Sequence, residues 1–279
     1  MERAIGLDPR NPQLLQSLSR NYLYLRRYRE VESLCHRLIE LSPDKPIFKL
    51  QTAAAAFLLK ADLVSFRTTL EHLRASMEES IDLAYVRLFA AVQACDWCRA
   101  REILNNSRND DFPFLFYCVV VPKVCIELWI SRLEKGHPPT ERRFAAARDQ
   151  LKRRVDERPE DARLLSALRL VDAALGRKQE AIEGAGHAVE MLPVSQDAWD
   201  GPGLVLYQTR VYALTGETDL ALKNLALSVK TPGGEYYCDL KLDPSLNPLR
   251  KDPRFEKFLA HLAPAENISV SDSELTRSR

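Results

Sequence analysis

The sequence predicts an all-α fold in which pairs of helices repeat along the chain and stack into a right-handed superhelical solenoid. Apolar residues recur at i, i+3, i+4 and i+7, the period of an amphipathic helix, and no stretch alternates with period two. A motif of about 34 residues returns along most of the 279-residue chain. Because a single helix pair cannot bury both of its faces, neighbouring pairs must stack.

The second helix of each repeat carries a small or apolar residue that sets the spacing. The residues at this position are Val31, Phe66, Ala100, Ala147, Ala181 and Ala221. The first two intervals are 35 and 34 residues, and the fourth is again 34. The third interval, 47 residues, predicts an insertion near 112–141, and the last, 40 residues, predicts one near 196–203.

These intervals divide the chain into five or six helix pairs and a C-terminal segment. The predicted parts are a remnant of an earlier second helix (1–10), the solenoid (11–230), a cap (231–263) and a disordered tail (264–279). Gly176 and Gly216 are expected to end first helices, where the left-handed conformation favours glycine.

The opening MERAIGLDPRNP resembles the end of a helix more than its beginning. Ala4 lies 34 positions before Leu38, and Pro9 lies 34 positions before Pro43. Residues 1–10 are therefore predicted to be the last turn of a second helix whose first helix is missing. This predicts a fragment of a longer protein. The alternative is a natural start in which a half-repeat serves as an N-terminal cap.

The most apolar stretch, FPFLFYCVVVPKVCIELWI, has the length of a membrane span. Lys123 and Glu127 lie inside it, and a charged residue at a bilayer centre costs roughly 2.5–3.5 kcal/mol. The sequence instead predicts a buried helix at about 114–134, broken near Pro122. No membrane partner is expected.

The C-terminal segment after residue 230 leaves the repeat pattern. Two turns precede a short helix predicted from about Pro253 to Leu262. Phe255 and Leu259, at i and i+4, would cover the open apolar face of the last pair, since solenoids need a polar-backed cap. The residues after 263 have almost no apolar content, which is typical of disorder.

The stretch LLSALRLVDAALGRKQEAIEGAGHAVEMLP resembles the tetratricopeptide repeat family, and the resemblance extends over about residues 1–230. The matching positions are Leu165, Leu168, Gly176, Ala181, Ala188 and Pro193. Asp172 departs from the pattern, because an aromatic residue is usual there. Two stretches are similar to modules at the C-termini of large bacterial signalling proteins that carry kinase, cyclase or winged-helix domains. These stretches are GRKQEAIEGAGHAVEMLPVSQDAWDGP and LDPSLNPLRKDPRFEKFL.

The resemblance implies a non-catalytic interaction or scaffolding module, the regulatory or sensory end of a larger bacterial signalling protein. Its partner would be a protein or peptide. The alternative is self-association, with residues 112–130 contributing the surface of a homodimer. Forty basic and thirty-nine acidic residues nearly cancel, so the bulk charge indicates no nucleic-acid partner.

In such a solenoid the first helices line a concave groove, which is the expected binding site. Tyrosine and arginine are enriched at binding hot spots, and glutamine can pair with a peptide backbone. The candidate groove residues are Gln13, Gln16, Arg20, Tyr24, Gln51, Tyr85, Phe89, Gln93, Arg163 and Arg210. The Lys/Asn/Arg clamp of the family's chaperone-tail binders is not assembled, because Gln16, Arg20, Gln51 and Thr52 occupy the corresponding positions.

Catalytic, cofactor and metal sites are not indicated. Cys95 and Cys98 form a CxxC, which could be a redox pair or half of a zinc site. It is placed on a turn without a βαβ context, and the next cysteines, Cys118 and Cys125, are seven apart, so coincidence is favoured. The five histidines are dispersed. Six cysteines without a disulfide framework suit the reducing cytoplasm.

Overall fold

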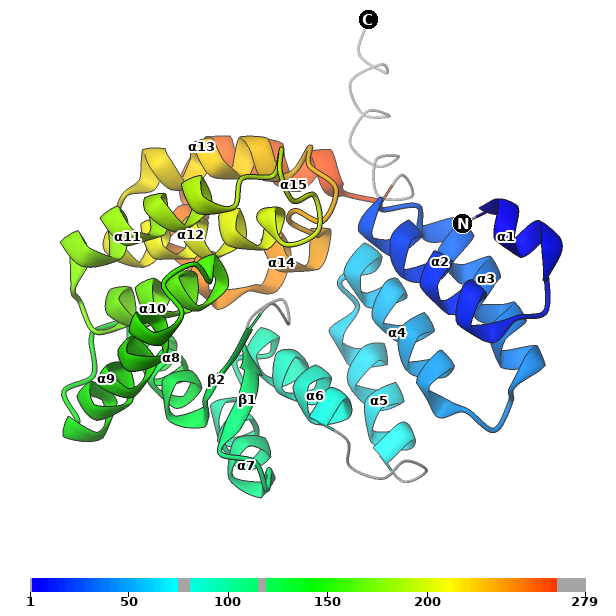
Figure 1. The fold of residues 1–279 in the computed structure, drawn as a ribbon, viewed down its shortest axis with the longest axis horizontal. Coiled ribbons are helices and arrows are strands. Elements are labelled where there is room, and N and C mark those ends of the chain that lie inside the picture. Colours follow the sequence, from blue (N-terminus) through cyan, green and yellow to red (C-terminus); the bar gives the residue numbers. More distant parts are fainter. Residues whose placement is uncertain (1, 75–80, 115–118, 265–279) are drawn as a thin grey trace, which may run out of the picture. The chain divides into compact units, whose positions relative to one another are not determined.

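The computed structural model describes residues 2–74, 81–114 and 119–264. Most of this part of the chain is helical, and consecutive helices pack in pairs, which confirms the all-α helix-pair class (Figure 1). The described residues form two compact units. Unit 1 holds residues 2–74, 236–242 and 256–264, and unit 2 holds residues 81–114, 119–235 and 243–255. The boundaries derived from the repeat, at 10, 230 and 263, stay a prediction. Cys118 and the tail after 264 lie outside the described residues.

Unit 1 is built from the N-terminal helices and one helix from much later in the chain. Its helices are α1 (Glu2–Leu7), α2 (Pro12–Tyr24), α3 (Tyr28–Leu41), α4 (Pro46–Lys60), α5 (Leu63–Arg74) and α14 (Tyr237–Leu242). Helix α2 begins where the side chain of Asn11 accepts hydrogen bonds from two backbone N–H groups, a favourable N-cap. Leu15 on α2 and Leu38 on α3 are fully buried between the paired helices. Helix α14 packs against α4.

Unit 2 contains the remaining helices and a small hairpin. Its elements are α6 (Ile81–Gln93), α7 (Trp97–Asn106), β1 (Asp111–Phe114), β2 (Val119–Pro122), α8 (Lys123–Lys135), α9 (Arg142–Glu157), α10 (Ala162–Ala174), α11 (Lys178–Met191), α12 (Gly201–Thr215), α13 (Thr218–Ser228) and the 3₁₀ helix η2 (Pro244–Leu249). Helices α10 and α12 are buried along nearly their whole length, as expected for helices that are apolar all round. They form the centre of this unit.

The turn between the two helices of each pair has one residue in the left-handed region. These residues are Arg26, Ala61, Cys95, Gly136, Gly176 and Gly216, with φ between 53° and 81°. The prediction for Gly176 and Gly216 is thus confirmed. The first two intervals between these residues, 35 and 34, and the last, 40, equal those of the second helices, whereas the third and fourth are 41 and 40 instead of 47 and 34. The turns therefore follow the register of the sequence repeat at both ends of the series and depart from it around Gly136.

The segment that was expected to be a helix from about residue 114 begins as a two-stranded antiparallel hairpin. Strand β1 pairs with β2 in the register Phe112 to Val121 and Phe114 to Val119, and a helix starts only at Lys123. The expectation was wrong at Phe114 and at Val119–Pro122, because a short apolar run with prolines at both ends suits a buried strand as well as a helix. Among the described residues, no helix is long and apolar enough to cross a membrane.

The C-terminal helix α15 spans Pro253–Leu262, as the sequence indicated. Phe255 is buried, while Leu259 is only half-buried. The Arg250 guanidinium lies over the Phe255 ring at 5.4 Å from its centroid. Residues through Phe255 belong to unit 2 and the rest of the helix to unit 1.

Candidate functional site

Helix α6 carries three of the candidate groove residues on one face. Tyr85, Phe89 and Gln93 follow one another at intervals of four, so they lie one above the other along the helix. The opposite side of α6 is anchored by Leu83 and Ala84, which are buried in the core. The structure therefore brings these three predicted residues together, and they line a pocket.

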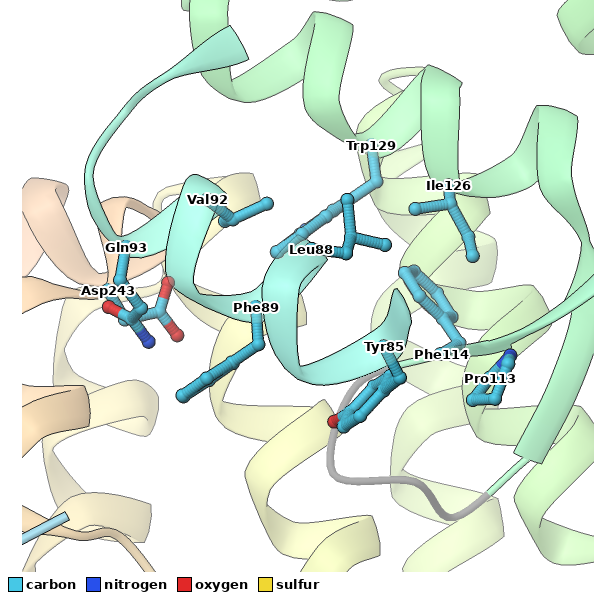
Figure 2. Close-up of a pocket in the computed structure, with 10 residues that line it drawn as sticks. All are labelled: Tyr85, Leu88, Phe89, Val92, Gln93, Pro113, Phe114, Ile126, Trp129 and Asp243. Atoms are coloured by element: carbon cyan, nitrogen blue, oxygen red, sulfur yellow. The ribbon is translucent and has the colours of Figure 1, made fainter. Parts of the chain in front are cut away.

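The pocket has a volume of about 460 Å³, its open mouth included. The enclosed part of the cavity is about 30 Å³, which has room for a small group only, and the remainder is open to solvent. Its lining residues are Tyr85, Leu88, Phe89, Val92, Gln93, Pro113, Phe114, Ile126, Trp129 and Asp243 (Figure 2). Apart from Gln93 and Asp243, the wall is apolar or aromatic. The pocket is therefore suited to an apolar group.

Two aromatic residues that sequence reasoning did not select complete the wall. Phe114 comes from β1 and Trp129 from α8, with their rings edge to face and the centroids 5.8 Å apart. Phe114 also meets Tyr207 of α12 edge to face, at 5.9 Å. Aromatic rings favour this edge-to-face geometry, which holds these side chains in place at the pocket wall. The hairpin places Phe114 here, and because this segment was expected to be helical, that placement was missed.

Two polar atoms of the lining residues have no hydrogen-bond partner among the described residues. They are the side-chain oxygen Oε1 of Gln93 and the indole Nε1 of Trp129. Gln93 is 5% exposed and Trp129 is 3% exposed, so both side chains are shielded from bulk solvent. A buried polar group left unpaired costs about 1–3 kcal/mol. The site thus contains one unused acceptor and one unused donor.

The carboxylate of Asp243 is fully hydrogen-bonded within the protein. Its Oδ1 accepts hydrogen bonds from the backbone N–H and the hydroxyl of Ser245, at 2.8 and 2.6 Å. Its Oδ2 accepts from Nε and Nη2 of Arg210, at 3.0 and 2.8 Å. Because each carboxylate oxygen already accepts two hydrogen bonds, a donor group that enters the pocket finds no free acceptor on Asp243. The site therefore suits a ligand that needs no ion pair with Asp243.

Arg210 is not a groove residue, contrary to the expectation from the repeat. It is fully buried, and besides Asp243 it contacts Glu235, with Nη1 2.6 Å from Oε1 and Nη2 3.1 Å from Oε2. Both acidic partners belong to the C-terminal segment outside the repeat pattern. The pattern alone therefore gave no indication that this position faces inward. Arg210 holds that segment on α12, where Asp243 reaches the pocket.

Arg163 is partly exposed but already paired. Its Nε lies 3.2 Å from Asp161, the N-cap residue of α10, and its Nη1 lies 3.4 Å from Asp200. These ion pairs fasten the start of α10 to the loop before α12. The structure does not bring Arg163 into the pocket lining.

The candidate residues of unit 1 lie on α2 and α4. Gln13 and Arg20 are exposed, whereas Gln16, Tyr24 and Gln51 are half-buried. Unit 1 has a groove of about 460 Å³, its open mouth included, but none of these five residues lines it. Its lining residues are Tyr28, Arg29, Glu32, Thr52, Ala55, Ala56, Leu59 and Lys60.

A second charged cluster surrounds Asp172, which occupies the position where the repeat usually has an aromatic residue. Its side chain is completely buried and lies 2.8 Å from Nε of Arg148 and 2.7 Å from Nη1 of Arg169. Gly184 on α11 gives Arg169 its room, because a Cβ there would lie 2.0 Å from its Nε. The unusual aspartate therefore replaces an aromatic contact with an ion-pair network between α9 and α10.

The CxxC begins in the turn between α6 and α7 and ends at Cys98, the second residue of α7. Cys95 is the left-handed residue of this turn, and Asp96 caps α7 by accepting from the backbone N–H of Arg99 at 3.2 Å. Both cysteines are free and exposed. Among the described residues, no group of three or more histidine, cysteine or acidic side chains is arranged to hold a metal ion.

Cysteine modification should separate the exposed thiols from the buried ones. With N-ethylmaleimide at neutral pH, we expect Cys98 to react rapidly, while Cys125 stays protected as long as the protein is folded. Burial raises the pKa of the Cys125 thiol to about 12, so the reactive thiolate is scarce as well as covered. Burial also raises the pKa of Cys95. Peptide mass spectrometry over time measures the rates. Equal rates at Cys98 and Cys125 would contradict the burial of α8.

Comparison with known proteins gives no support for a particular function. No protein-family model and no curated protein matches the sequence. Among solved structures, the crystal structure of the yeast Tom70 aligns with 94% of this chain at 14% identity, with a TM-score of 0.27. The aligned part spans 63% of the Tom70 chain. At that score the likeness carries no argument about ligands or partners, so the function has to be argued from the site itself.

Proposed function

We propose that this chain is a non-catalytic protein-interaction module and that the α6 pocket binds a segment of its partner. The observation that carries this proposal is the convergence of Tyr85 and Phe89 with Phe114 and Trp129 around an open, apolar cavity. Aromatic side chains are the residues on which binding energy concentrates at interfaces. A packed helical core beneath them keeps the site preorganised, which lowers the entropy cost of binding.

We further infer that the protein is cytoplasmic and that this chain is the regulatory or sensory end of a bacterial signalling protein. The support for the second inference is the resemblance of residues 176–202 and 242–259 to such modules. The support for the first is that the five described cysteines are free. The partner would thus be another protein of the same signalling system.

Self-association through residues 112–130 is the weaker alternative. In the described part of this segment the large apolar side chains are mostly inside unit 2. Those buried are Phe112, Phe114, Val121, Cys125, Ile126, Leu128, Trp129 and Ile130. Val120 is exposed, at 46% of its surface. The described part of the segment therefore offers little apolar surface to a second copy.

Selection from a displayed library of random dodecapeptides tests the proposal. We expect the wild-type chain to enrich peptides that it binds in solution, and Phe89→Ala to weaken that binding at least tenfold. Phe89 is only partly buried, so truncation removes contact surface without opening the core. Fluorescence anisotropy of a labelled peptide measures the affinity.

Trp199→Ala is the matched control, because Trp199 is another large aromatic residue of unit 2 and 56% of its surface is exposed. It should leave the affinity unchanged. The proposal fails if no peptide is enriched, or if Phe89→Ala and Trp199→Ala bind the selected peptides as wild type does.

A further inference from the structure

The polar groups of the pocket indicate which chemical class of ligand it takes. Resting on the proposed function, we infer that the α6 pocket binds a neutral, apolar residue of an extended polypeptide and pairs with that residue's backbone amides. The ligand carbonyl would accept from Trp129 Nε1–H, and a ligand N–H would donate to Gln93 Oε1.

The argument for an amide rests on the unpaired atoms. Trp129 offers a donor and Gln93 an acceptor, and each side chain is more than nine-tenths buried without a partner for that atom among the described residues. A hydrocarbon would leave both atoms unpaired, and an amine or a carboxylate would bring a charge. An amide group carries one carbonyl acceptor and one N–H donor, which matches the pair in number and in neutrality.

The argument for an apolar and uncharged side chain rests on the walls. Tyr85, Phe89, Phe114 and Trp129 offer aromatic surface, and Asp243 has both carboxylate oxygens committed to Arg210 and Ser245. A lysine side chain would therefore lose its hydration without gaining an ion pair. A leucine-sized side chain would gain from the burial of its apolar surface.

Access to the two atoms requires a small movement. Both are covered in this structure, with Trp129 extending from α8 toward α6 beside Leu88 and Val92, and Gln93 lying next to Asp243 at the end of α6 (Figure 2). Gln93 is the last residue of its helix and has a long, unbranched side chain. Rotation of this side chain would open the polar end of the pocket as the ligand enters.

Titration of the ¹⁵N-labelled chain with blocked amino acids tests the inference. The probes are N-acetyl-leucinamide, N-acetyl-glycinamide and N-acetyl-lysinamide, and the readout is the indole N–H resonance of Trp129, assigned with Trp129→Phe. We expect the leucine probe to shift this resonance saturably, at a concentration roughly tenfold or more below that of the other two probes. The resonance of Trp199 should stay in place.

The variant Gln93→Met separates recognition from structure. It keeps the length of the side chain and removes the unpaired oxygen, so we expect an unchanged or higher melting temperature together with roughly tenfold weaker binding of the leucine probe. A purely structural role for Gln93 predicts the same affinity as wild type.

The inference is overturned if Trp129 does not respond to any probe, which would leave water as the occupant, or if leucine and lysine probes bind equally. It is also overturned if Gln93→Met binds as wild type does. If dodecapeptides still bind in a Phe89-dependent way under those outcomes, the proposed function stands and only the ligand class is wrong. If no dodecapeptide binds, the proposed function itself fails.

Discussion

Replacing Arg210 by methionine should lower the free energy of unfolding of unit 2 by about 3–5 kcal/mol, because it leaves two buried carboxylates without their cation. Glu235 and Asp243 are both buried beside this guanidinium. Urea unfolding followed by tryptophan fluorescence measures the effect selectively. All three tryptophans, Trp97, Trp129 and Trp199, belong to unit 2.

Arg163→Met is the matched control for this experiment. Its ion pairs with Asp161 and Asp200 are partly exposed, so its loss should cost at most about 1 kcal/mol. Adding Glu235→Gln to Arg210→Met should restore part of the lost stability, since one of the two stranded charges is then removed. If Arg210→Met is no more damaging than Arg163→Met, the buried network does not hold the C-terminal segment in place.

Replacing Asp172 by leucine should lower the free energy of unfolding of unit 2 by about 3–5 kcal/mol, because a buried cation then loses its buried carboxylate partner. Arg148 is only 9% exposed and would lose its 2.8 Å contact, keeping only a 3.5 Å contact with the exposed Asp149, whereas Arg169 can turn toward water. The same fluorescence-monitored urea unfolding measures the loss, since both helices lie in unit 2.

A double-mutant cycle makes this second expectation specific. Asp172→Leu combined with Arg148→Met should recover much of the stability, because replacing both partners by apolar groups removes the stranded charge. Arg177→Met serves as the control, since Arg177 is 46% exposed and lies 3.5 Å from Asp172. Additive losses in the double variant would mean that the two residues act independently.

The helix pairs could be predicted because their causes are local. Apolar periodicity, the cap at Asn11, the prolines and the glycines at 176 and 216 each act within a few residues, and the sequence displays all of them. The same holds for one face of the pocket. The spacing of Tyr85, Phe89 and Gln93 on one helix follows from the helical period alone.

The rest of the site depends on contacts between distant segments. Arg210 meets Glu235 and Asp243, 25 and 33 residues later in a part of the chain that does not repeat. Phe114 reaches the pocket through a hairpin whose apolar run is compatible with either helix or strand. Neither partner choice is visible from a periodic pattern, which describes only how each helix faces its neighbours in the repeat.

Helix α14 has a consequence for how the protein is made. Unit 1 includes Leu240, which is fully buried, yet this residue is translated 163 positions after Met77. At about 5–20 residues per second, a ribosome needs about 8–30 s to cover that distance. During this interval the surface of α4 that receives α14 has no covering helix. Unit 1 can therefore complete its folding only after α14 has been synthesised.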